Sequence, residues 1–408
     1  MTIASGIAKL LVAKKQSALG TKATAASAQY YRRTSSNIEL TKDTYESAEI
    51  RPDRQVQDFR HGLRKVGGTI SGELSTGTYQ SFIESTLGAA ASAAINSGAL
   101  TDVTAAVTSG ASGTFTTVGA NWLTLGFKVG MVVRWTGWTA PATANNDHNF
   151  LITALSSTVM TGTMLDGVAV VAKASGDSVT ATEPGKHISI PITAHTKDYW
   201  TIEHAYSDIT QSEQFTDCVF TKMDVKLPPT GMSTVDFAVV GLDMDTSTSA
   251  YFTTPTAVTS TGILAAVNGA LYVSGTKVAT VTGLDFSVDN GSTAVGAVVG
   301  SNVSPDVTAG IYKVSGNATV FFQDATLRDL FDNETESSLV GVFTDSNLPG
   351  AGFQSFVMPR LKFGGAAKDD GVKALTMTMP FTALYNSAGG TGTSSHQTTF
   401  TMYDSAFA

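Results

Sequence analysis

The sequence predicts a mainly β protein in which one β-sandwich or barrel domain, flanked by a short helix, occurs twice and carries a small inserted β-domain. Short runs of alternating apolar and polar residues dominate the chain, and Gly, Ser, Thr and Val are abundant. A strand-turn-helix pattern also recurs at an offset of 248 residues. With 408 residues, of which 42% are hydrophobic and 15% charged, the chain can build two or three packed domains.

The repeated stretch is first seen at 62–87, GLRKVGGTISGELSTGTYQSFIESTL. Its strand places Val66, Ile70 and Leu74 on one face, and its helix carries Tyr79, Phe82, Ile83 and Leu87 at helical spacing. The copy shares five of 22 positions and keeps the pattern without a gap. Its matching residues are Gly310, Lys313, Val314 and Gly316 in the strand and Leu327, Leu330 and Phe331 in the helix. We therefore predict an internal duplication.

The domain order follows from where the repeat is interrupted. Between its two halves lie short strands separated by Gly- and Asn-rich turns, typical of an inserted small β-domain whose core or rim holds Trp135 and Trp138. We predict these segments: an N-terminal arm, 1–35, with a short helix from about Ile3 to Ala13; domain 1, 36–92 and 190–244; the insertion, 93–189; a crossover, 245–280; and domain 2, 281–408.

Charge is unevenly distributed along the chain. Residues 1–66 hold 12 Lys or Arg against 6 Asp or Glu, whereas the chain as a whole has a net charge of −8. Such a basic front on an acidic body can self-associate head to tail, although a solvated basic tail fits the charge equally well. We expect the charged stretch 46–61 to be a long surface loop. Lys9 interrupts the only apolar run near the N-terminus, so we expect neither a secretory signal nor a membrane insertion.

Residues that could carry chemistry are scattered. Phosphate loops, nucleotide-binding fingerprints, nucleophile elbows and paired metal-ligand spacings are all missing from the sequence, so we expect no enzyme, no metal and no cofactor. Asp243 and Asp245 resemble the start of a calcium loop that lacks its glycine and closing glutamate. The single cysteine, Cys218, is expected to be a buried small hydrophobe. The six histidines fall on different elements: His61, His148, His187, His195, His204 and His396.

The strand faces opposite the predicted core are small, polar and weakly charged, and Phe321 is the one aromatic residue expected on them. One interpretation is a sheet face in contact with solvent, which antiparallel sheets commonly have. The sharper interpretation is a wall past which a polyanion slides without binding, since the face has neither a basic stripe nor a stacking platform. The candidate residues on these faces are Lys65, Thr69, Ser71, Glu73, Thr234, Asp236, Lys313, Ser315, Asn317, Thr319, Thr376 and Thr378.

The run RRTSSNIELTKDTYESAEIRPDRQVQDFRHGLRKVGGTISGELSTGTYQSFIEST, 32–86, closely resembles tail tube (major tail) proteins of long, non-contractile-tailed bacteriophages. The segments TIEHAYSDITQSEQFTDCVFTKMDVKL and ALYVSGTKVATVTGLDFSVDNG resemble later blocks of the same family. The resemblance implies subunits joined into rings by a shared sheet, with the polar faces lining the lumen. It also implies rings stacked through the arm and the charged loop, where the candidate inter-ring residues are Arg32, Arg33, Arg51, Asp53, Arg54, Asp58 and Arg60.

The resemblance also implies the partners. Related rings hold six tube domains, so a chain with two domains needs three copies, and we predict a trimeric ring with pseudo-sixfold symmetry, with a hexamer as the alternative. The tube would assemble around a tape-measure protein, meet a tail terminator and distal tail or baseplate proteins, and pass double-stranded DNA. Such a protein would be made in the host cytoplasm and reside in the virion tail. A competing hypothesis is a β-rich surface or adhesin module that binds a ligand through the insertion.

Overall fold

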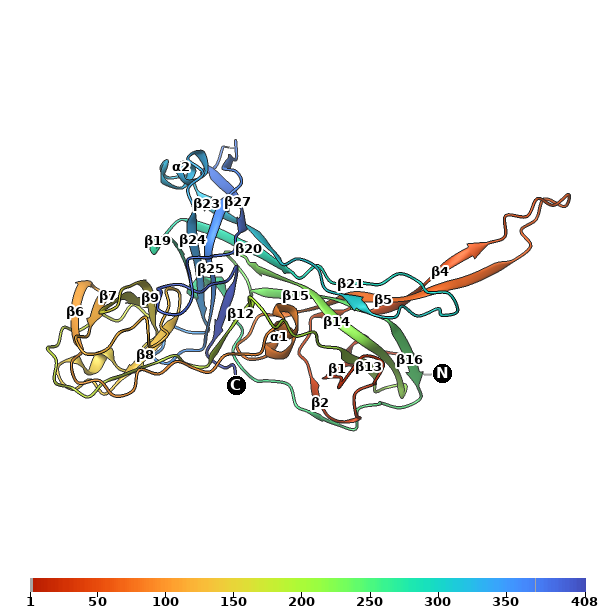
Figure 1. The fold of residues 1–408 in the computed structure, drawn as a ribbon, viewed down its shortest axis with the longest axis horizontal. Coiled ribbons are helices and arrows are strands. Elements are labelled where there is room, and N and C mark those ends of the chain that lie inside the picture. Colours follow the sequence, from red (N-terminus) through yellow and green to blue (C-terminus); the bar gives the residue numbers. More distant parts are fainter. Residues whose placement is uncertain (1–2, 371) are drawn as a thin grey trace.

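The computed structural model describes residues 3–370 and 372–408 and is built mostly of strands (Figure 1). It contains two α-helices, α1 (Gln80–Leu87) and α2 (Thr326–Asp332), and 3-10 turns at Gly6–Ala8, Ala142–Asn145 and Ala266–Asn268. The strands up to the insertion are β1 (Lys9–Lys15), β2 (Ala26–Tyr30), β3 (Ser35–Ser36), β4 (Glu39–Glu46) and β5 (Phe59–Glu73). The insertion holds β6 (Thr104–Ser109), β7 (Ser112–Thr116), β8 (Val132–Thr136), β9 (Phe150–Leu155), β10 (Val159–Met164) and β11 (Thr180–Thr182).

The remaining strands complete the first repeat and build the second. They are β12 (Lys186–Ser189), β13 (Trp200–Tyr206), β14 (Gln211–Leu227), β15 (Thr234–Gly241), β16 (Asp243–Ser247), β17 (Thr254–Thr256), β18 (Gly269–Val273), β19 (Thr276–Val278), β20 (Val281–Asp289), β21 (Thr293–Ala294), β22 (Val307–Thr308), β23 (Lys313–Phe321), β24 (Ser337–Thr344), β25 (Phe353–Phe363), β26 (Ala367–Lys368), β27 (Thr376–Ala383) and β28 (Thr401–Asp404). The predicted mainly β class is therefore confirmed, as are the antiparallel hairpins β14–β15 and β25–β27.

Six strands form the middle of one continuous antiparallel sheet that runs through both repeats, with β3 and β4 beyond one end and β25 and β26 beyond the other. Their order is β5, β15, β14, β20, β23 and β27, so the two repeats meet where β14 pairs with β20. The long strands β14 and β25 also belong to a second sheet. The first half of β14 pairs with β13 and β16. In the second repeat, the first part of β25 pairs with β24 and β28, and its end pairs with β27. A strand that belongs to two sheets turns the corner of a sandwich. Apolar side chains from both repeats fill one shared core.

The strand pairing repeats with the sequence. In the first repeat Leu40 lies opposite Val66, and in the second Val288 lies opposite Val314, which are the residues 248 positions further on. The pairing of β14 with β15 also shifts its register by one residue after Phe220. In the second repeat β25 and then β26 pair with β27, and this pairing shifts by one residue after Phe363. Phe363 lies 143 residues after Phe220, at the equivalent position of the repeat. Because register and bulge are both repeated, the duplication extends to the backbone geometry.

The repeated glycine has the same steric role in both copies. A Cβ at Gly68 would lie 2.6 Å from the Cα of Ile38, and one at Gly316 would lie 2.8 Å from the Cα of Phe286. Ile38 and Phe286 are themselves equivalent residues of the repeat. The neighbouring strand therefore passes too close at this point for any side chain, which explains why both copies keep glycine.

The two repeats differ in how they pack their helices. In the first, Phe82 of α1 is fully buried and stacks on Tyr31 and Phe220, with ring centroids 4.1 and 4.3 Å apart. The residues at the positions of Phe82 and Tyr31 in the second repeat are Leu330 and Ala279. Both line a cavity of ≈ 450 Å³ under α2, and none of the residues of α2 is buried. The smaller side chains leave the second helix loosely covered.

The N-terminal segment is folded onto the first repeat. The predicted helix from Ile3 to Ala13 is wrong, because residues 9–15 form β1, which pairs with β13 over seven residues. Leu11, Val12 and Ala13 are consecutive and buried, and such a short apolar run fits a buried strand as well as a helix. The predicted arm is therefore docked from Lys9 onward.

The insertion has its own six-stranded sheet, in the order β11, β8, β9, β10, β7 and β6. Its core is continuous with the second repeat, because Val340, Val357 and Tyr403 belong to the same buried cluster. Trp135 and Trp138 are buried in that core, as predicted. The two connecting segments run side by side, since the Ser92 N–H donates to the His187 carbonyl oxygen at 2.8 Å. The insertion lies at one end of the molecule, at the lower left of Figure 1.

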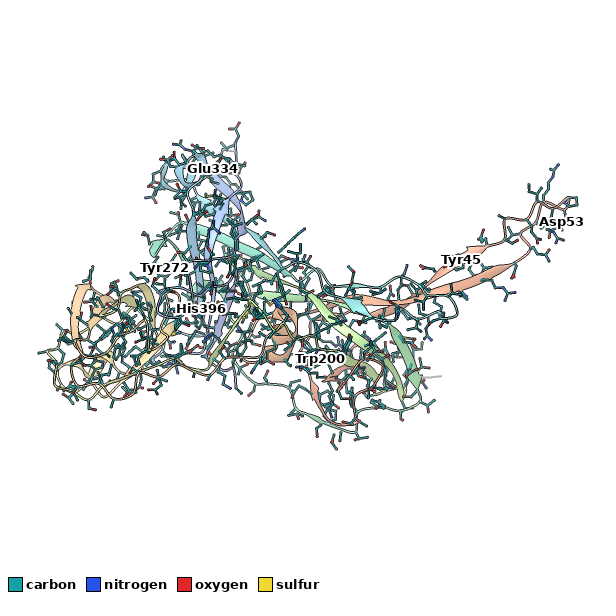
Figure 2. The ribbon with its side chains drawn as sticks, in the orientation of Figure 1. Tyr45, Asp53, Trp200, Tyr272, Glu334 and His396 are labelled. Carbon is teal, nitrogen blue, oxygen red and sulfur yellow. The ribbon has the colours of Figure 1, made fainter. Side chains whose placement is uncertain are left out.

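A buried polar cluster ties these connecting segments to the C-terminal strand β28. The Nδ1 atom of His187 lies 2.8 Å from a carboxylate oxygen of Glu183, and Nε2 of His396 lies 2.6 Å from the Tyr403 hydroxyl. Burial lowers the pKa of His396 to about 3, and the nearby His187 and Lys128 act in the same direction. The folded chain therefore keeps the imidazole of His396, which is labelled in Figure 2, neutral.

Replacing Gly316 by Ala should lower the free energy of unfolding by about 1–3 kcal/mol, since the new Cβ would stand 2.2 Å from the Asp285 carbonyl oxygen. Gly283 lies in the same pair of strands, and none of the described atoms lies within 4 Å of its Cβ position. Gly283→Ala is thus the matched control and should change stability little. Urea unfolding of both variants measures the difference; equal losses would contradict the steric explanation.

His396 should make the fold less stable in acid. Its pKa is about 3 when folded against an ordinary 6.5, so the unfolded chain binds a proton that the folded chain does not. Stability is therefore complete above about pH 6.5 and falls as pH decreases toward 3, by up to ~1.4 kcal/mol per pH unit. Unfolding curves at several pH values should show a shallower acid loss for His396→Gln; an unchanged slope would exclude this residue as the cause.

Candidate functional site

The outer face of the six-stranded sheet carries rows of small polar residues. Residues directly opposite one another on neighbouring strands share a face, so the pairing defines each row. One row runs through Ser71, Asp236, Asp224, Ser287, Ser315 and Thr382. The alternate residues of the same strands, among them Ile70, Phe237 and Val225, are buried. One polar band therefore crosses both repeats without interruption.

All the predicted face residues lie on this one band, although they come from four different strands. Lys65, Thr69, Ser71 and Glu73 come from β5; Thr234 and Asp236 from β15; Lys313, Ser315, Asn317 and Thr319 from β23; Thr376 and Thr378 from β27. The prediction omitted the central strands β14 and β20, which add Lys222, Asp224, Lys226, Asp285, Ser287 and Asp289. Their alternation with buried residues was visible in the sequence, but the β14–β20 pairing was not.

Charges on the band are nearly balanced and largely paired. Its four lysines face five carboxylates, and three of the lysines form ion pairs: Lys222 with Asp224 at 2.8 Å, Lys226 with Asp236 at 3.6 Å and Lys65 with Asp43 at 2.7 Å. These pairs are partly exposed, so each stabilises the fold by less than about 1 kcal/mol. Their main effect is to leave few unpaired cations for a phosphate backbone.

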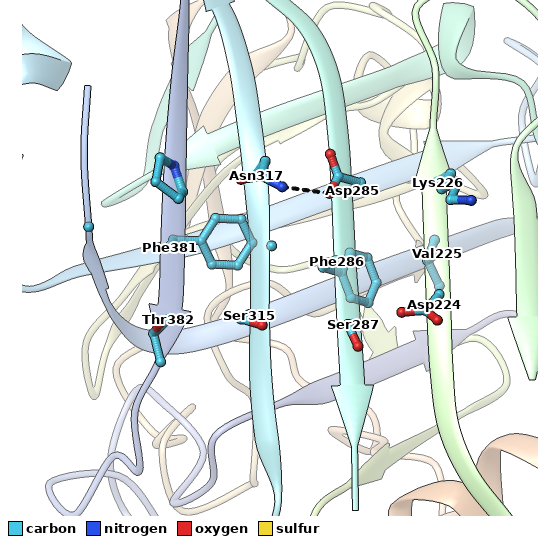
Figure 3. Close-up of a pocket in the computed structure, with 13 residues that line it drawn as sticks. Asp224, Val225, Lys226, Asp285, Phe286, Ser287, Ser315, Asn317, Phe381 and Thr382 are labelled. Carbon is cyan, nitrogen blue, oxygen red and sulfur yellow. Dashed lines mark hydrogen bonds between the residues drawn. The ribbon is translucent and has the colours of Figure 1, made fainter. Parts of the chain in front are cut away.

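A depression of ≈ 390 Å³ lies in this band where β14, β20, β23 and β27 run side by side (Figure 3). The Asn317 amide donates to an Asp285 carboxylate oxygen at 2.9 Å across its upper part. Phe381 lines the depression, but it is buried and presents little ring surface. The depression therefore offers a nucleic acid no stacking platform.

The β4–β5 hairpin projects far from the body of the molecule (Figure 1). The long loop predicted at 46–61 is shorter than expected: only residues 47–58 lie outside the strands, because the ladder continues to the pair of Glu46 and Phe59. Acidic and basic side chains at its end pair with each other, Arg51 with Asp53 at 3.0 Å and Arg60 with Asp58 at 2.8 Å. Hydrogen bonds from these arginines lower the pKa of both carboxyls.

The candidate inter-ring residues fall in two separate places. Arg51, Asp53, Arg54, Asp58 and Arg60 lie on the exposed end of the hairpin, where Asp53 is labelled in Figure 2. In contrast, Arg32 donates to the Thr261 carbonyl oxygen at 2.9 Å, and Arg33 donates to the Lys9 carbonyl oxygen. These two arginines are engaged within the chain, so the hairpin end is the freer surface.

The basic charge of the N-terminal segment also finds partners within the chain. Lys15 pairs with Asp198 at 2.7 Å, and Lys22 pairs with Asp245 at 3.4 Å. Asp243, the other residue of the calcium-like motif, pairs with Arg64 at 2.6 Å. The basic front and the acidic body thus meet within one molecule.

Chemically reactive groups are dispersed over the part of the chain that the structure describes. Within it, no three His, Cys, Asp or Glu side chains come together as a metal site, and no helix is long and apolar enough to cross a membrane. Cys218 is fully buried, and that burial raises the pKa of its thiol. The polar band and the hairpin are therefore the surfaces that call for an explanation.

Comparison with known families agrees with the architecture. The sequence model of a family described as "Phage tail tube protein" matches residues 6–383, which is most of the chain. The chain belongs to the phage tail tube protein family. It is accordingly a structural protein of the virion tail that self-assembles into a tube. A search of the curated proteins found no match.

Proposed function

We propose that three chains close into a ring with pseudo-sixfold symmetry, and that stacked rings form a tube through which double-stranded DNA leaves the particle. The observation that carries the proposal is the sheet that runs through both repeats in one register. Two equivalent units joined edge to edge are one third of a six-unit ring, and a closed ring leaves no sheet edge exposed. A ring of six chains is the alternative stoichiometry.

The polar band supplies the wall of the proposed bore. DNA binds proteins mainly through cations that replace its counterions, and the lysines of this band are mostly paired with carboxylates. The net charge of −8 adds weak repulsion. Apart from Phe321, which lies opposite Thr376 and is 44% exposed, this wall is small and polar. It therefore offers a moving duplex few unpaired cations and little aromatic surface for stacking.

The projecting hairpin supplies the axial contact between rings. Its end is fully outside the core and carries both signs of charge, which suits a surface that meets a complementary one. The N-terminal segment contributes from the base of the same repeat. Tube growth would then occur around a tape-measure protein, between distal tail or baseplate proteins and a terminator, after synthesis in the host cytoplasm.

Electron microscopy of the concentrated protein tests directly whether it forms tubes. Lysine substitutions on the polar band test whether this band lines the bore. Replacing Thr69, Ser71, Thr319 and Thr376 by Lys should leave tubes intact but slow DNA ejection at low salt by roughly tenfold or more. The delay should shrink as salt rises, because counterion release is then less favourable.

Four lysines on the insertion give the matched control, at Thr108, Ser109, Ser157 and Ser175, which are exposed and outside the proposed bore. This variant carries the same added charge and should eject DNA at the wild-type rate. Equal delays in both variants would show that total charge, rather than the band, sets the rate. Wild-type speed in the first variant would remove the band from the bore.

Shortening the hairpin should separate ring formation from stacking. Replacing residues 48–57 by Asn-Gly removes exposed residues and the partly exposed Arg51, whose ion-pair partner Asp53 is removed with it. The free energy of unfolding should therefore change by about 0.5 kcal/mol or less. We expect rings without long tubes in electron micrographs. Removing 297–300, from the corresponding loop of the second repeat, is the control and should leave tubes intact. Normal tubes from the shortened hairpin would contradict its axial role.

A further inference from the structure

The two repeats of one chain are joined by a ladder that we call the internal seam, residues 222–227 of β14 against 284–289 of β20. Apolar residues face each other across it on the core side, and all of them are buried. The pairs are Met223 with Val288, Val225 with Phe286 and Leu227 with Leu284. On the other side, Lys222 and Lys226 lie opposite Asp289 and Asp285. The internal seam is thus complementary on both faces.

Each side of the internal seam has a counterpart elsewhere in the chain. Residues 365–370 of the second repeat are equivalent to residues 222–227 of the first, 143 positions earlier. Residues 36–41 of the first repeat are equivalent to residues 284–289 of the second, 248 positions later. Among the described residues, β26 pairs only with β27, and β3 and β4 pair only with β5. One chain therefore ends in two open sheet edges that match the two sides of its own internal seam.

A lysine caps one of these open edges. The Lys9 ammonium donates to the Ser36 carbonyl oxygen at 2.7 Å. The equivalent of Ser36 in the second repeat is Leu284, which lies within the β14–β20 ladder. Lysine at a sheet edge is a common protection against unplanned pairing.

A second, independent observation comes from the hairpins. The short hairpin β21–β22 is the counterpart of the outer part of β4–β5, since Ala294 pairs with Val307 as Glu46 pairs with Phe59. Val307 is fully buried because it packs on Val219 and the adjoining residues of the first repeat. Phe59 occupies the same position but is 49% exposed. An aromatic side chain is thus exposed where its counterpart is covered by the adjacent repeat.

We propose that residues 36–41 of one chain pair antiparallel with residues 365–370 of the next, in the register of the internal seam. Glu39 then lies opposite Ala367, and Thr41 lies opposite Gly365. This inference rests on the proposed ring and adds the strands and the register that close it.

The seam between chains is more polar than the internal seam. Lys368 and Asp370 stand where Val225 and Leu227 stand, and Lys368 already lies over the Phe322 ring, 3.7 Å from its centroid. Little apolar surface is therefore buried between chains, and backbone hydrogen bonds carry the affinity, as in other cases of strand addition. The chain can accordingly remain separate until it is added to a growing tube.

Cysteines test the register. Directly opposite residues of antiparallel strands have Cα atoms about 4.5–5.5 Å apart, within the range that a disulfide spans. Oxidised tubes of the variant with Glu39→Cys and Ala367→Cys should give covalent dimers and trimers on non-reducing gels, and the ladder should stop at three chains. Asp224→Cys with Ser287→Cys is the matched pair within one chain and should migrate as a monomer. The native Cys218 is buried and does not interfere.

Thr41→Cys with Asp369→Cys controls for random collision, because a four-residue shift separates the thiols by about 13 Å. It should give no covalent oligomers. If the first variant forms no tubes, Thr41→Cys with Gly365→Cys tests the same register. If both variants with correctly registered cysteines form tubes but no cross-links, the proposed pairing between chains is wrong, whereas the proposed tube is still supported. Wild-type protein that forms no tubes would instead overturn the proposed function, and a ladder ending at six chains would replace the trimer.

Discussion

The ladder between β14 and β20 is the constraint on which the rest of the structure depends. It joins the two repeats through six residue pairs, and its apolar side is continuous with the shared core. Because strand pairing fixes both direction and face, joining the repeats in this way puts every polar row of the first in line with a row of the second. A single polar band across six strands is the result.

The repeats have kept their backbone and changed their side chains. Register, bulge and glycine position are the same, since each is imposed by the close approach of neighbouring strands. The helices differ, because Tyr31 and Phe82 fill a space that Ala279 and Leu330 leave open. The hairpins differ as well, one projecting and the other lying on the adjacent repeat. The features that strand pairing requires are thus the same in both repeats, whereas the helix packing and the hairpins differ between them.

Much of the fold and of the candidate band could be predicted because alternation is a local signal. Val66, Ile70 and Leu74 are buried, and Thr69, Ser71 and Glu73 share the opposite face. The β14–β20 pairing could not be predicted, since its strands are separated by more than fifty residues and nothing local specifies a partner. The predicted helix at the position of β1 is wrong because a short apolar run has no distinctive period. Ring stoichiometry and the bore assignment remain predictions.

Charge shows why composition alone is an incomplete guide to assembly. The basic excess near the N-terminus suggests a contact between molecules, yet Lys15 and Lys22 pair with acidic residues of the same chain. The hairpin end, by contrast, carries both signs of charge in nearly equal number, and its ion pairs join residues close together in the sequence. An exposed, projecting segment with little net charge is therefore better placed to contact another molecule than a basic segment whose lysines already form ion pairs within the chain. Exposure and existing partners therefore decide which charges are available for assembly, and both depend on the fold.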